Sequence, residues 1–409
     1  MFANGKTDFG KIIRPHCQMT IAAAEEYQVI LSIGDTTFLD YRTIKVKKGG
    51  YGPTGNGGNG LILHSALAIE PQQGQTLGLL WQKLWNREHK PKPPKDETPE
   101  QKKQRHKSAR KAARQRPFAQ KESYKWVEAI TELDKQVEAS TQVIHVFDRE
   151  GDISEVFEQM RQLKHTGVLV RAAHNRSLDK NSERLWDKME SEPIRFTQEI
   201  DVPATANSKG RKAKLAVRFC SVNLRNPYRF DNRDPLKVYA VYATQIDCPA
   251  GETPLSWMLL TTEVVADVNM AATILRWYTY RWRVEEYHKI LKSGCQSERY
   301  RLAAVGMKTL LGFLSVIAVE LLQVTYLHRT QPDAPAQEIL NPVQLKVLKA
   351  ASPIKLPKIL TVTWAVETVA YLGGYLEHRR KTPIGIQVLW RGWLKLHDLC
   401  EGWQLARGT

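Results

Sequence analysis

The chain has 409 residues, of which 42% are hydrophobic and 9% aromatic, so it holds enough apolar material for more than one packed core. Its 60 Lys and Arg residues exceed its 43 Asp and Glu residues, and the resulting net charge of +17 favours a polyanionic partner, with simple solubility as the alternative explanation. The five cysteines are scattered and form no C-x-x-C pair, which argues against a zinc knuckle or a disulfide framework and fits a reducing compartment.

The first elements place an acidic residue after a strand. The sequence predicts a helix and then three strands, at residues 22–27, 29–33, 61–69 and 76–81. The first of these strands is expected to end at Asp35, within an antiparallel meander. The glycine-dense loop at residues 49–60 has no G-K-[ST] and no strand-loop-helix context, so we interpret it as a hairpin excursion and not as a phosphate cradle.

Residues 83–125 differ in composition from the rest of the chain. They hold 15 Lys and Arg against 5 Asp and Glu, and so carry +10 of the net charge of +17. Prolines disfavour regular structure early in this segment, whereas residues 100–116 are able to form a helix. We predict a mobile, basic surface excursion, for which two roles are open: a non-specific grip on DNA phosphates, or simple solvation.

The next elements alternate between helix and strand. Helices are predicted at residues 124–139 and 153–164, and strands at residues 143–147 and 167–172. The strand at 143–147 is apolar throughout, as expected for a buried central strand, and it ends in Asp148. A strand-rich region follows, with strands predicted at residues 194–200, 213–222, 237–245 and 257–261.

A long helix is predicted from residue 270 to 293, and one of its faces combines an acid with several cations. At about 100° per residue, five side chains fall within roughly 80° of arc: Tyr278, Arg281, Glu285, Lys289 and Lys292. The opposite face is apolar. Two interpretations are open: a solvated face of ion pairs, each contributing about 0.3–0.5 kcal/mol, or a site that holds a cation and a phosphate together. Apolar helices and a C-terminal helical region follow.

The acids of the two strands and of the helix together predict a metal site. If the two strands are neighbours, Asp35 and Asp148 meet, and Glu285 joins them from a helix packed on the sheet. Three gathered carboxylates repel one another unless divalent cations neutralise them. Oxygen ligands favour Mg²⁺ or Mn²⁺, and two such ions about 4 Å apart activate an attacking water or 3′-hydroxyl. The alternative is that each aspartate is only a turn or helix cap.

No segment predicts export or membrane insertion. The N-terminus lacks the apolar core of a signal peptide. The most apolar run, residues 310–319, is too short to span a bilayer and is followed by Glu320. We therefore expect a soluble, cytoplasmic protein without membrane contact, in which this run is a buried helix.

The same residues carry a resemblance to a known family. Tyr278-x2-Arg281-x3-Glu285-x6-Lys292 matches the Y-(2)-R-(3)-E-(6)-K signature of the insertion-sequence-four family of DDE transposases. Residues 33–37 and 147–153 resemble the segments that carry the family's first two acids. Further similar segments lie at residues 251–260, 372–375 and 389–393. The chain resembles the family from about residue 10 to its end.

The resemblance implies a fold and a catalytic site. The implied fold is α/β, with an RNase H-like core, a β-rich insertion and an α-helical C-terminal region. Asp35, Asp148 and Glu285 would be the catalytic residues and the ligands of Mg²⁺ or Mn²⁺, with two ions expected.

The resemblance also implies DNA contacts. Tyr278, Arg281 and Lys292 would bind phosphates at the transposon end, and Lys289 on the same helix face and Arg171 after a core strand are further candidates. Trp257 lies where the family inserts an aromatic ring against a flipped base during hairpin formation. The alternative for Trp257 is a core tryptophan in a strand.

The expected function is cut-and-paste transposition of an insertion sequence by metal-dependent DNA cleavage and strand transfer. The expected partners are double-stranded DNA, as inverted-repeat ends and target, and a second copy of the chain in the DNA complex, at the nucleoid of a prokaryotic cell. Only 34 residues precede Asp35, where the family has a DNA-recognition domain. An N-terminally shortened, DNA-binding and dimerising inhibitor of transposition is therefore the alternative expectation.

Five regions are expected from this comparison. They are a remnant of the DNA-binding region at 1–28, the first part of the core at 29–174 with the basic excursion 83–125, the β-rich insertion at 175–262, the second part of the core at 263–330, and a helical dimerisation region at 331–409.

Overall fold

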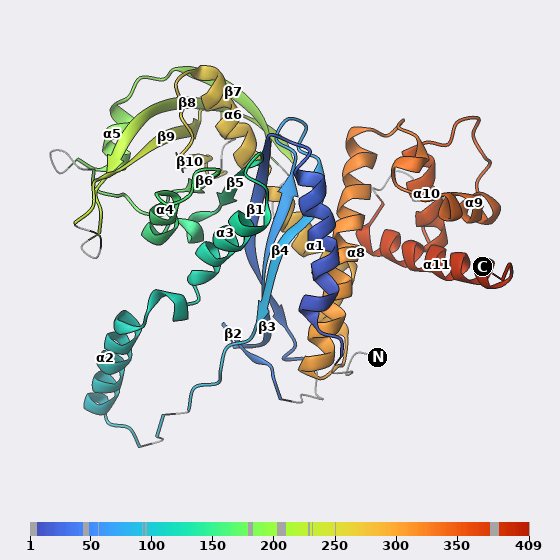
Figure 1. Ribbon diagram of the computed structural model, residues 1–409, viewed down its shortest axis with the longest axis horizontal. Helices are drawn as coiled ribbons and strands as arrows, with labels where there is room; N and C mark the ends of the chain where they lie inside the picture. The colour runs from blue at the N-terminus through green and yellow to red at the C-terminus, as the bar shows by residue number, and fades with distance from the viewer. Residues whose placement is uncertain are drawn as a thin grey trace.

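The computed structural model describes residues 6–43, 49–55, 57–91, 93–94, 96–178, 183–202, 210–227, 230, 232–249, 251–376 and 384–408. Among these residues, a mixed sheet of ten strands is flanked by helices, and a helical region follows it (Figure 1). The predicted α/β class is confirmed, and the architecture is consistent with an RNase H-like fold with a C-terminal helical region.

The sheet has a parallel centre between antiparallel strands. Its described strands are β1 (Val29–Asp40), β2 (Gly52–Gly55), β3 (Gly58–Ile69), β4 (Thr76–Trp85), β5 (Gln142–Phe147), β6 (Thr166–Arg171), β7 (Phe196–Val202), β8 (Arg211–Leu224), β9 (Leu236–Gln245) and β10 (Ser256–Thr261). The order is β2-β3-β1-β5-β6-β10-β9-β8-β7, and β4 pairs with β3. β1 is antiparallel to β3 and parallel to β5, which is parallel to β6. Because parallel strands are covered on both faces, β5 is apolar almost throughout.

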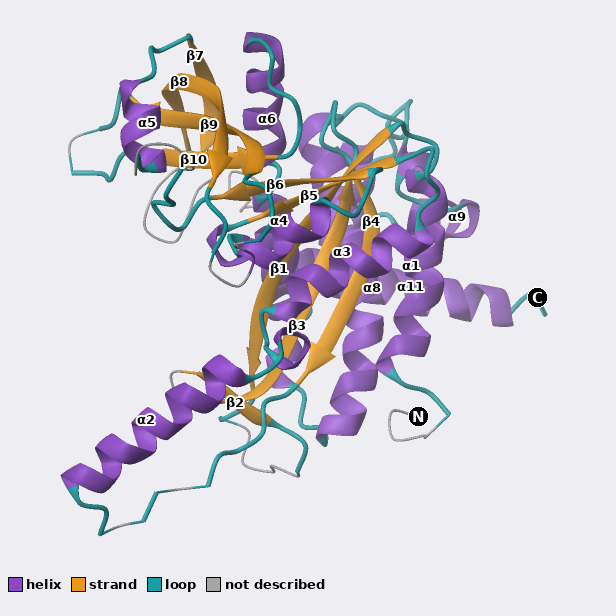
Figure 2. Ribbon diagram, turned by 60° about the vertical axis from the view of Figure 1, so that its left-hand side comes forward, coloured by secondary structure: helices purple, strands orange, loops and turns teal. Residues whose placement is uncertain are grey.

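Helices cover both faces of the sheet's centre (Figure 2). The described α-helices are α1 (Phe9–Ala24), α2 (Pro99–Gln115), α3 (Tyr124–Gln136), α4 (Ser154–Met160), α5 (Leu185–Ser191), α6 (Val268–Thr279), α7 (Trp282–Lys289), α8 (Ala304–Thr330), α9 (Pro342–Ala351), α10 (Val362–Leu372) and α11 (Ile386–Leu405). α7 and α8 share a core with Leu31 and Ile33 of β1. α3 and α4 share a core with Phe147 of β5 on the other face.

The N-terminal helix differs from its prediction. α1 spans Phe9–Ala24 and not residues 22–27, and it begins where Asp8 accepts a hydrogen bond from the Lys11 backbone N–H. Ile13 and Cys17 are buried on the side that packs against β4 and α8. The described part of the predicted N-terminal remnant is therefore integrated in the core packing.

The sequence predicted that the first strand ends at Asp35, but β1 continues to Asp40. β3 pairs with it from Leu31 to Asp40, so the strand keeps one partner along this length. The parallel partner β5 pairs only as far as Ile33. Asp35 thus lies within a strand, just beyond the end of its parallel pairing.

The helix predicted from residue 270 to 293 is divided into three elements. The prediction of one continuous helical face is therefore wrong. α6 ends at Thr279, and the chain turns through Tyr280 and Arg281 into α7. A π-helix, η4 (Ile290–Gly294), follows α7 directly. The wider turn of a π-helix shifts the residues after it around the axis. α6 packs against β7 and β9, whereas α7 packs against β1 and β3.

The strand-rich region after residue 175 forms the antiparallel meander β7–β10. β10 pairs with β6, so the meander continues the core sheet. The basic excursion contains the helix α2, close to the predicted boundaries.

α8 is long and apolar enough to cross a membrane, but 67% of its apolar window is buried inside the molecule. It packs against α1, β4 and α10, which is consistent with the core helix of a soluble protein. The buried helix predicted around residues 310–319 is confirmed.

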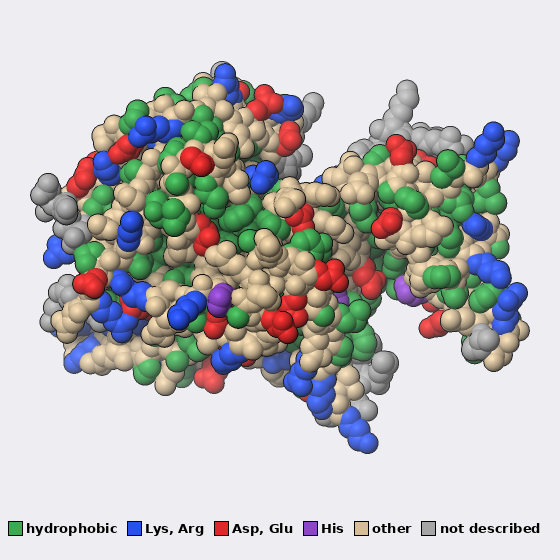
Figure 3. Space-filling model, turned by 45° about the horizontal axis from the view of Figure 1, so that its top comes forward, with side chains coloured by type: hydrophobic (Ala, Val, Ile, Leu, Met, Phe, Trp, Pro, Cys, Tyr) green, Lys and Arg blue, Asp and Glu red, His purple; other side chains and the backbone are tan. Residues whose placement is uncertain are grey.

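The C-terminal helices α9, α10 and α11 form a lobe beside the sheet (Figure 1). Trp364, Trp390 and Trp393 are buried within it, so these tryptophans have the core role that is common for large aromatic residues. On the face shown in Figure 3, Lys and Arg side chains are interspersed with Asp and Glu.

Candidate active site

Strand register brings three predicted site residues into one row. The parallel pairing of β1 with β5 ends at Ile33 and Val146, and two positions further along each strand stand Asp35 and Asp148. The pairing of β5 with β6 ends at Phe147 opposite Val170, so Asp148 and Arg171 occupy the next position. The row lies at the carboxyl ends of β5 and β6, the edge where open α/β sheets bind ligands.

The row points toward α7 because strand side chains alternate between the two faces. Leu31 and Ile33 precede Asp35 on its face of β1, and Ile144 and Val146 precede Asp148 in the same way. These apolar residues belong to the core shared with α7. The sheet therefore aims both carboxylates at the helix that carries Glu285.

Gly34 allows the packing behind Asp35. A Cβ atom at this position would lie 2.7 Å from Cε1 of Phe147 and 3.4 Å from Cζ3 of Trp126. These two rings are buried against each other at a centroid distance of 4.7 Å. A side chain at position 34 would push them away, so glycine keeps β1 close to α3 at the acidic site.

Asp148 is both a cap and a candidate ligand. Its Oδ1 accepts the Glu150 backbone N–H at 2.8 Å, at the start of the 3-10 turn Arg149–Gly151. Burial raises the pKa of Asp148, and the negative charge of Asp35 raises it further, against the opposing effects of the Glu150 N–H and Arg281. Asp148 therefore caps this turn through Oδ1, whereas its Oδ2 accepts no hydrogen bond from the residues that the structure describes.

Asp35 is held in its ionised form by its neighbours. Burial acts to raise the pKa of Asp35, but the contact with His288, the Thr36 backbone N–H and the charge of Arg281 together lower the pKa below its ordinary value. His288 Nδ1 lies 3.6 Å from Asp35 Oδ2, and the His288 side chain is only 8% exposed. Opposite pKa shifts on two adjacent carboxyls are typical of functional acid pairs.

Arg281 lies among the acids. Its Nη2 donates to Glu285 Oε1 at 2.6 Å, and its side chain is only 12% exposed. Its positive charge also lowers the pKa of Asp35 and opposes the rise at Asp148. One guanidinium therefore compensates charge on all three predicted ligands.

Glu285 reaches this region but pairs with the arginine. Its side chain is 52% exposed in the first turn of α7. In the part of the chain that the structure describes, no group of three or more His, Cys, Asp or Glu side chains is close enough to hold a metal ion. The residues still suit a hard divalent cation, because the donors are carboxylate oxygens and Asp148 has an unfavourable negative neighbour that a cation would neutralise.

Tyr278 and Arg171 lie beside the acids. The pKa of the buried Tyr278 hydroxyl is raised by burial and, more weakly, by the charge of Asp148, while Arg281 and Arg171 oppose the rise. Arg171 Nη2 donates to the Ser256 carbonyl at 2.8 Å, and its buried Nε has no hydrogen-bond partner among the described residues. Burial lowers the pKa of Arg171. Two cations thus flank the acids, as a phosphate site requires.

Trp257 belongs to the core of this region. It is 3% exposed on β10, and its ring lies edge-on to Tyr278 at 5.1 Å and to Trp282 at 5.6 Å. This matches the alternative of a core tryptophan in a strand. Contact with a flipped base would require Tyr278 or Trp282 to move.

Lys289 and Lys292, the two lysines of the predicted face, have different surroundings. Lys289 is exposed near the end of α7. Lys292 lies in the π-helix, where its Nζ donates to the Phe38 carbonyl at 2.9 Å and lies 3.5 Å from Glu298. Lys292 is thus bound near the end of β1, three residues beyond Asp35.

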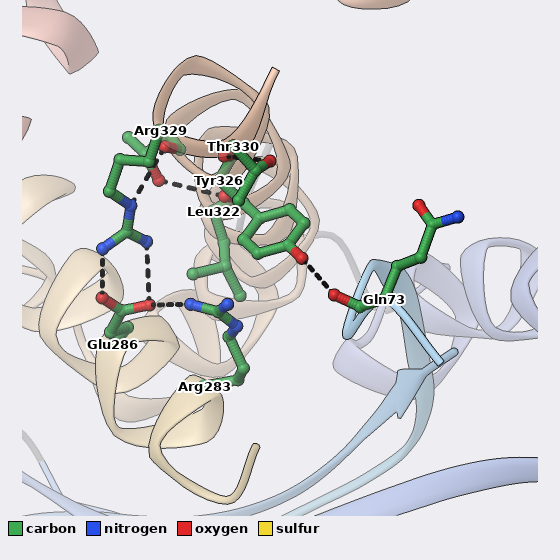
Figure 4. A network of polar contacts seen from close by, with 8 residues as sticks. Gln73, Arg283, Glu286, Leu322, Tyr326, Arg329 and Thr330 are labelled. Atoms are coloured by element: carbon green, nitrogen blue, oxygen red, sulfur yellow. Dashed lines mark hydrogen bonds and ion pairs between the residues drawn. The ribbon is translucent and has the colours of Figure 1, made fainter. Parts of the chain in front are cut away.

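Glu286 is distinct from its neighbour Glu285. It accepts hydrogen bonds from Arg329 of α8 at 2.8 and 3.1 Å and from Arg283 at 3.1 Å (Figure 4). These ion pairs connect α7 to α8 and leave Glu286 to a structural role. The choice of Glu285 over Glu286 agrees with this geometry.

Sequence reasoning missed two histidines. His288 follows Glu285 by three residues, and this i,i+3 spacing was a usable signal for its place beside the site. His64 stands opposite Thr36 in the β1–β3 register, and its Nδ1 lies 2.8 Å from the Thr36 hydroxyl. Burial lowers the pKa of His64 well below its ordinary value, so it is a neutral support behind the acids.

No known protein-family model matches the chain.

Proposed function

We propose that the chain is a DDE transposase of the insertion-sequence-four type, which cleaves and joins DNA with bound Mg²⁺ or Mn²⁺. The observation that supports this most is the row of Asp35, Asp148 and Arg171 across three strands. The row faces α7, which carries Glu285 and has Arg281 at its N-cap. Acids and cations lie together there, which suits a phosphodiester bound between metal ions and guanidinium groups. The Tyr278–Lys292 signature has the spacing of that family.

Arg281 would exchange partners when DNA arrives. A phosphate offers the planar guanidinium a bidentate partner, at least as good as one oxygen of an exposed carboxylate. Glu285, released from Arg281, would then turn toward Asp35 and Asp148 and complete the set of three carboxylates. When bound there, two Mg²⁺ or Mn²⁺ ions would activate an attacking water or 3′-hydroxyl and stabilise the leaving oxygen.

The other cations would position the DNA. The buried Nε of Arg171 has no partner among the described residues, and Arg171 stands next to Asp148 in the strand register, so a phosphate near the acids would accept a hydrogen bond from it. Tyr278 would contribute its hydroxyl to the same phosphate, and Lys289 and Lys292 would contact the backbone further along α7 and η4. Trp257 would stack on a flipped base of the hairpin intermediate after its aromatic neighbours move.

The proposed partners are double-stranded inverted-repeat ends, target DNA and a second copy of the chain, at the nucleoid in a prokaryotic cytoplasm. α11 exposes Leu394, Leu399 and Leu405, by 41%, 37% and 80%, which suits an interface in the C-terminal region. The same surface supports the alternative function, a DNA-binding and dimerising inhibitor, which is favoured by the pairing of Glu285 with Arg281. Cleavage activity separates the two.

The test is single-turnover cleavage of paired inverted-repeat ends, taken from the DNA that flanks the gene, with Mg²⁺ or Mn²⁺. The wild type should nick the ends and form a hairpin, and Asp35→Asn, Asp148→Asn and Glu285→Gln should each abolish nicking. Glu286→Gln is the matched control, because it removes the neighbouring acid and should leave nicking intact. Wild-type nicking by all three site variants would refute the proposal. Association with a longer copy, without specific end binding and without nicking, would support the inhibitor instead.

A further inference from the structure

α2 carries a one-sided stripe of positive charge. The helix projects from the body of the molecule, and none of its residues is buried (Figures 1 and 2). Its 17 residues include seven Lys and Arg and one Glu. Four of the cations follow the spacing i, i+4, i+7, i+11 and so lie within about 60° of arc: Lys103, Lys107, Arg110 and Arg114.

The four stripe cations differ from Arg105 of the same helix, because they make no ion pair with the described residues. Arg105, on another side of α2, makes a bidentate ion pair with Glu97 at 2.6 and 2.9 Å. Within the described residues, no ion pair involves any of the four stripe cations. Like charges at i,i+4 destabilise a helix. A row of unpaired cations therefore repels itself, and a row of negative charges alongside would remove that cost.

α2 is stabilised by local signals and not by burial. Thr98 and Gln101 form a reciprocal capping box, and Pro99 occupies the first turn. These devices stabilise a helix that has no apolar face. The capping box and Pro99 thus keep the stripe in helical geometry on a solvent-exposed helix.

The two ends of the basic excursion that contains α2 lie close to the acidic site. Arg87, after β4, makes two hydrogen bonds with Glu122, at 2.8 and 2.7 Å, which join the two ends of the excursion. Lys125 Nζ then lies 3.3 Å from Glu150, whose backbone N–H is bound by Asp148. The ends of the excursion are thus connected, through Lys125 and Glu150, to Asp148, a predicted metal ligand. A duplex that leaves the acidic site on this side would meet α2.

We propose that α2 is a DNA-binding arm whose stripe of Lys103, Lys107, Arg110 and Arg114 lies along the phosphate backbone of the duplex beside the cleavage site. This rests on the proposed function, because it assumes that the acidic site receives DNA. The stripe runs from Lys103 to Arg114, about 17 Å at 1.5 Å per residue, so the contact covers about five base pairs. It reads no bases and adds affinity that depends strongly on salt.

The test neutralises the stripe and compares it with a matched set of cations elsewhere. The stripe variant is K103Q/K107Q/R110Q/R114Q, in which glutamine keeps helix propensity. The control variant is K349Q/K355Q/K358Q/R391Q, which removes four exposed cations from the C-terminal region. Affinity for a duplex containing one inverted-repeat end is measured by fluorescence anisotropy without divalent metal, between 50 and 200 mM salt. Thermal unfolding confirms that both variants fold.

The wild type and the control variant should share one affinity and one salt dependence. The stripe variant should bind roughly 10- to 100-fold more weakly at 100 mM salt, and the slope of log K against log salt should fall by about 3 to 4. Hydroxyl-radical footprints should lose protection over about five base pairs beside the nicking site. Equal affinity and slope for wild type and stripe variant, or an equal loss in the control variant, would overturn the inference.

The binding and nicking measurements test the DNA-binding role of α2 independently of the proposed cleavage activity. Nicking of the ends by the wild type, together with unchanged binding by the stripe variant, refutes the arm and retains the proposed function. Weak binding by the stripe variant without nicking by the wild type retains the arm and refutes the catalytic assignment. If the wild type binds no duplex at 50 mM salt, both are refuted.

Discussion

The two halves of the acidic site are held by different forces. Asp35 is fixed within β1, which pairs with β3 at this position, and Asp148 directly follows β5 and caps the turn that begins there. Glu285 is placed by α7 and by a single ion pair with Arg281, and half of its side chain is exposed. The comparison indicates a preformed half and an adjustable half. Because Glu285 is half exposed, solvent weakens this ion pair, and a bound phosphate or metal ion has enough binding energy to rearrange it.

Substitutions in the preformed half, at Asp35 and Asp148, should reduce DNA cleavage the most. Asp35→Asn and Asp148→Asn keep the shape of each side chain and remove the charge, so each should lower single-turnover cleavage at least about 10³-fold and weaken Mn²⁺ binding. Cleavage assays and Mn²⁺ electron paramagnetic resonance measure the two effects separately. A loss below about tenfold in either variant would show that the strand pair is not the centre of the chemistry.

The adjustable half is tested through Arg281. In the wild type, DNA should tighten Mn²⁺ binding by about 5- to 150-fold, because phosphate would take Arg281 away from Glu285, and the coupling is reciprocal. In Arg281→Gln, Glu285 is already free, so Mn²⁺ affinity should be the same with and without DNA, while cleavage falls roughly 100-fold. Titrations with an uncleavable end duplex measure this coupling. Equal coupling in wild type and variant would mean that Arg281 does not control Glu285.

The preformed half was also the half that sequence could predict. An apolar run that ends in Asp148 indicates a central strand, and a second run before Asp35 indicates a neighbour, so their meeting followed from general rules for sheets. The row with Arg171 depended on register, which no local pattern specifies. The extension of β1 past Asp35 depended on β3, a partner that continues after β5 has ended.

The adjustable half was predicted less well, for physical reasons. The break between α6 and α7 occurs at Tyr280 and Arg281, without the Pro or Gly that usually marks such a break. It follows from packing, because α6 lies on β9 and α7 lies on β1. The π-helix moved Lys292 to the Phe38 carbonyl, and the burial of Trp257 depends on two aromatic neighbours that are distant in sequence.

Protein stability without metal should distinguish the two aspartates of the preformed half. Asp35 has a lowered pKa, so its charge stabilises the fold above the ordinary value near 3.8, and this contribution is lost as pH falls. Asp148 has a raised pKa, so its ionisation opposes folding as pH rises through that value. At pH 7.5 in EDTA, Asp35→Asn should lower the unfolding temperature and Asp148→Asn should raise it, each by about 2 °C. Below pH 4 both differences should shrink. Shifts of the same sign at pH 7.5 would contradict the opposite charge environments.

The smallest effect is expected from substitution of Glu286, which is adjacent to Glu285 in α7 but lies outside the adjustable half. Its bonds to Arg329 and Arg283 tie α7 to α8, but Arg329 is 50% exposed, so solvent screens most of the attraction. Glu286→Gln should therefore lower the free energy of unfolding by only about 1 kcal/mol, measured by urea titration. Metal affinity and cleavage should match the wild type, because Glu286 faces α8 and not the row of aspartates. A loss of Mn²⁺ binding in this variant, with folding intact, would move the helix-borne ligand from Glu285 to Glu286 and make the ion pair with Arg329 the adjustable contact.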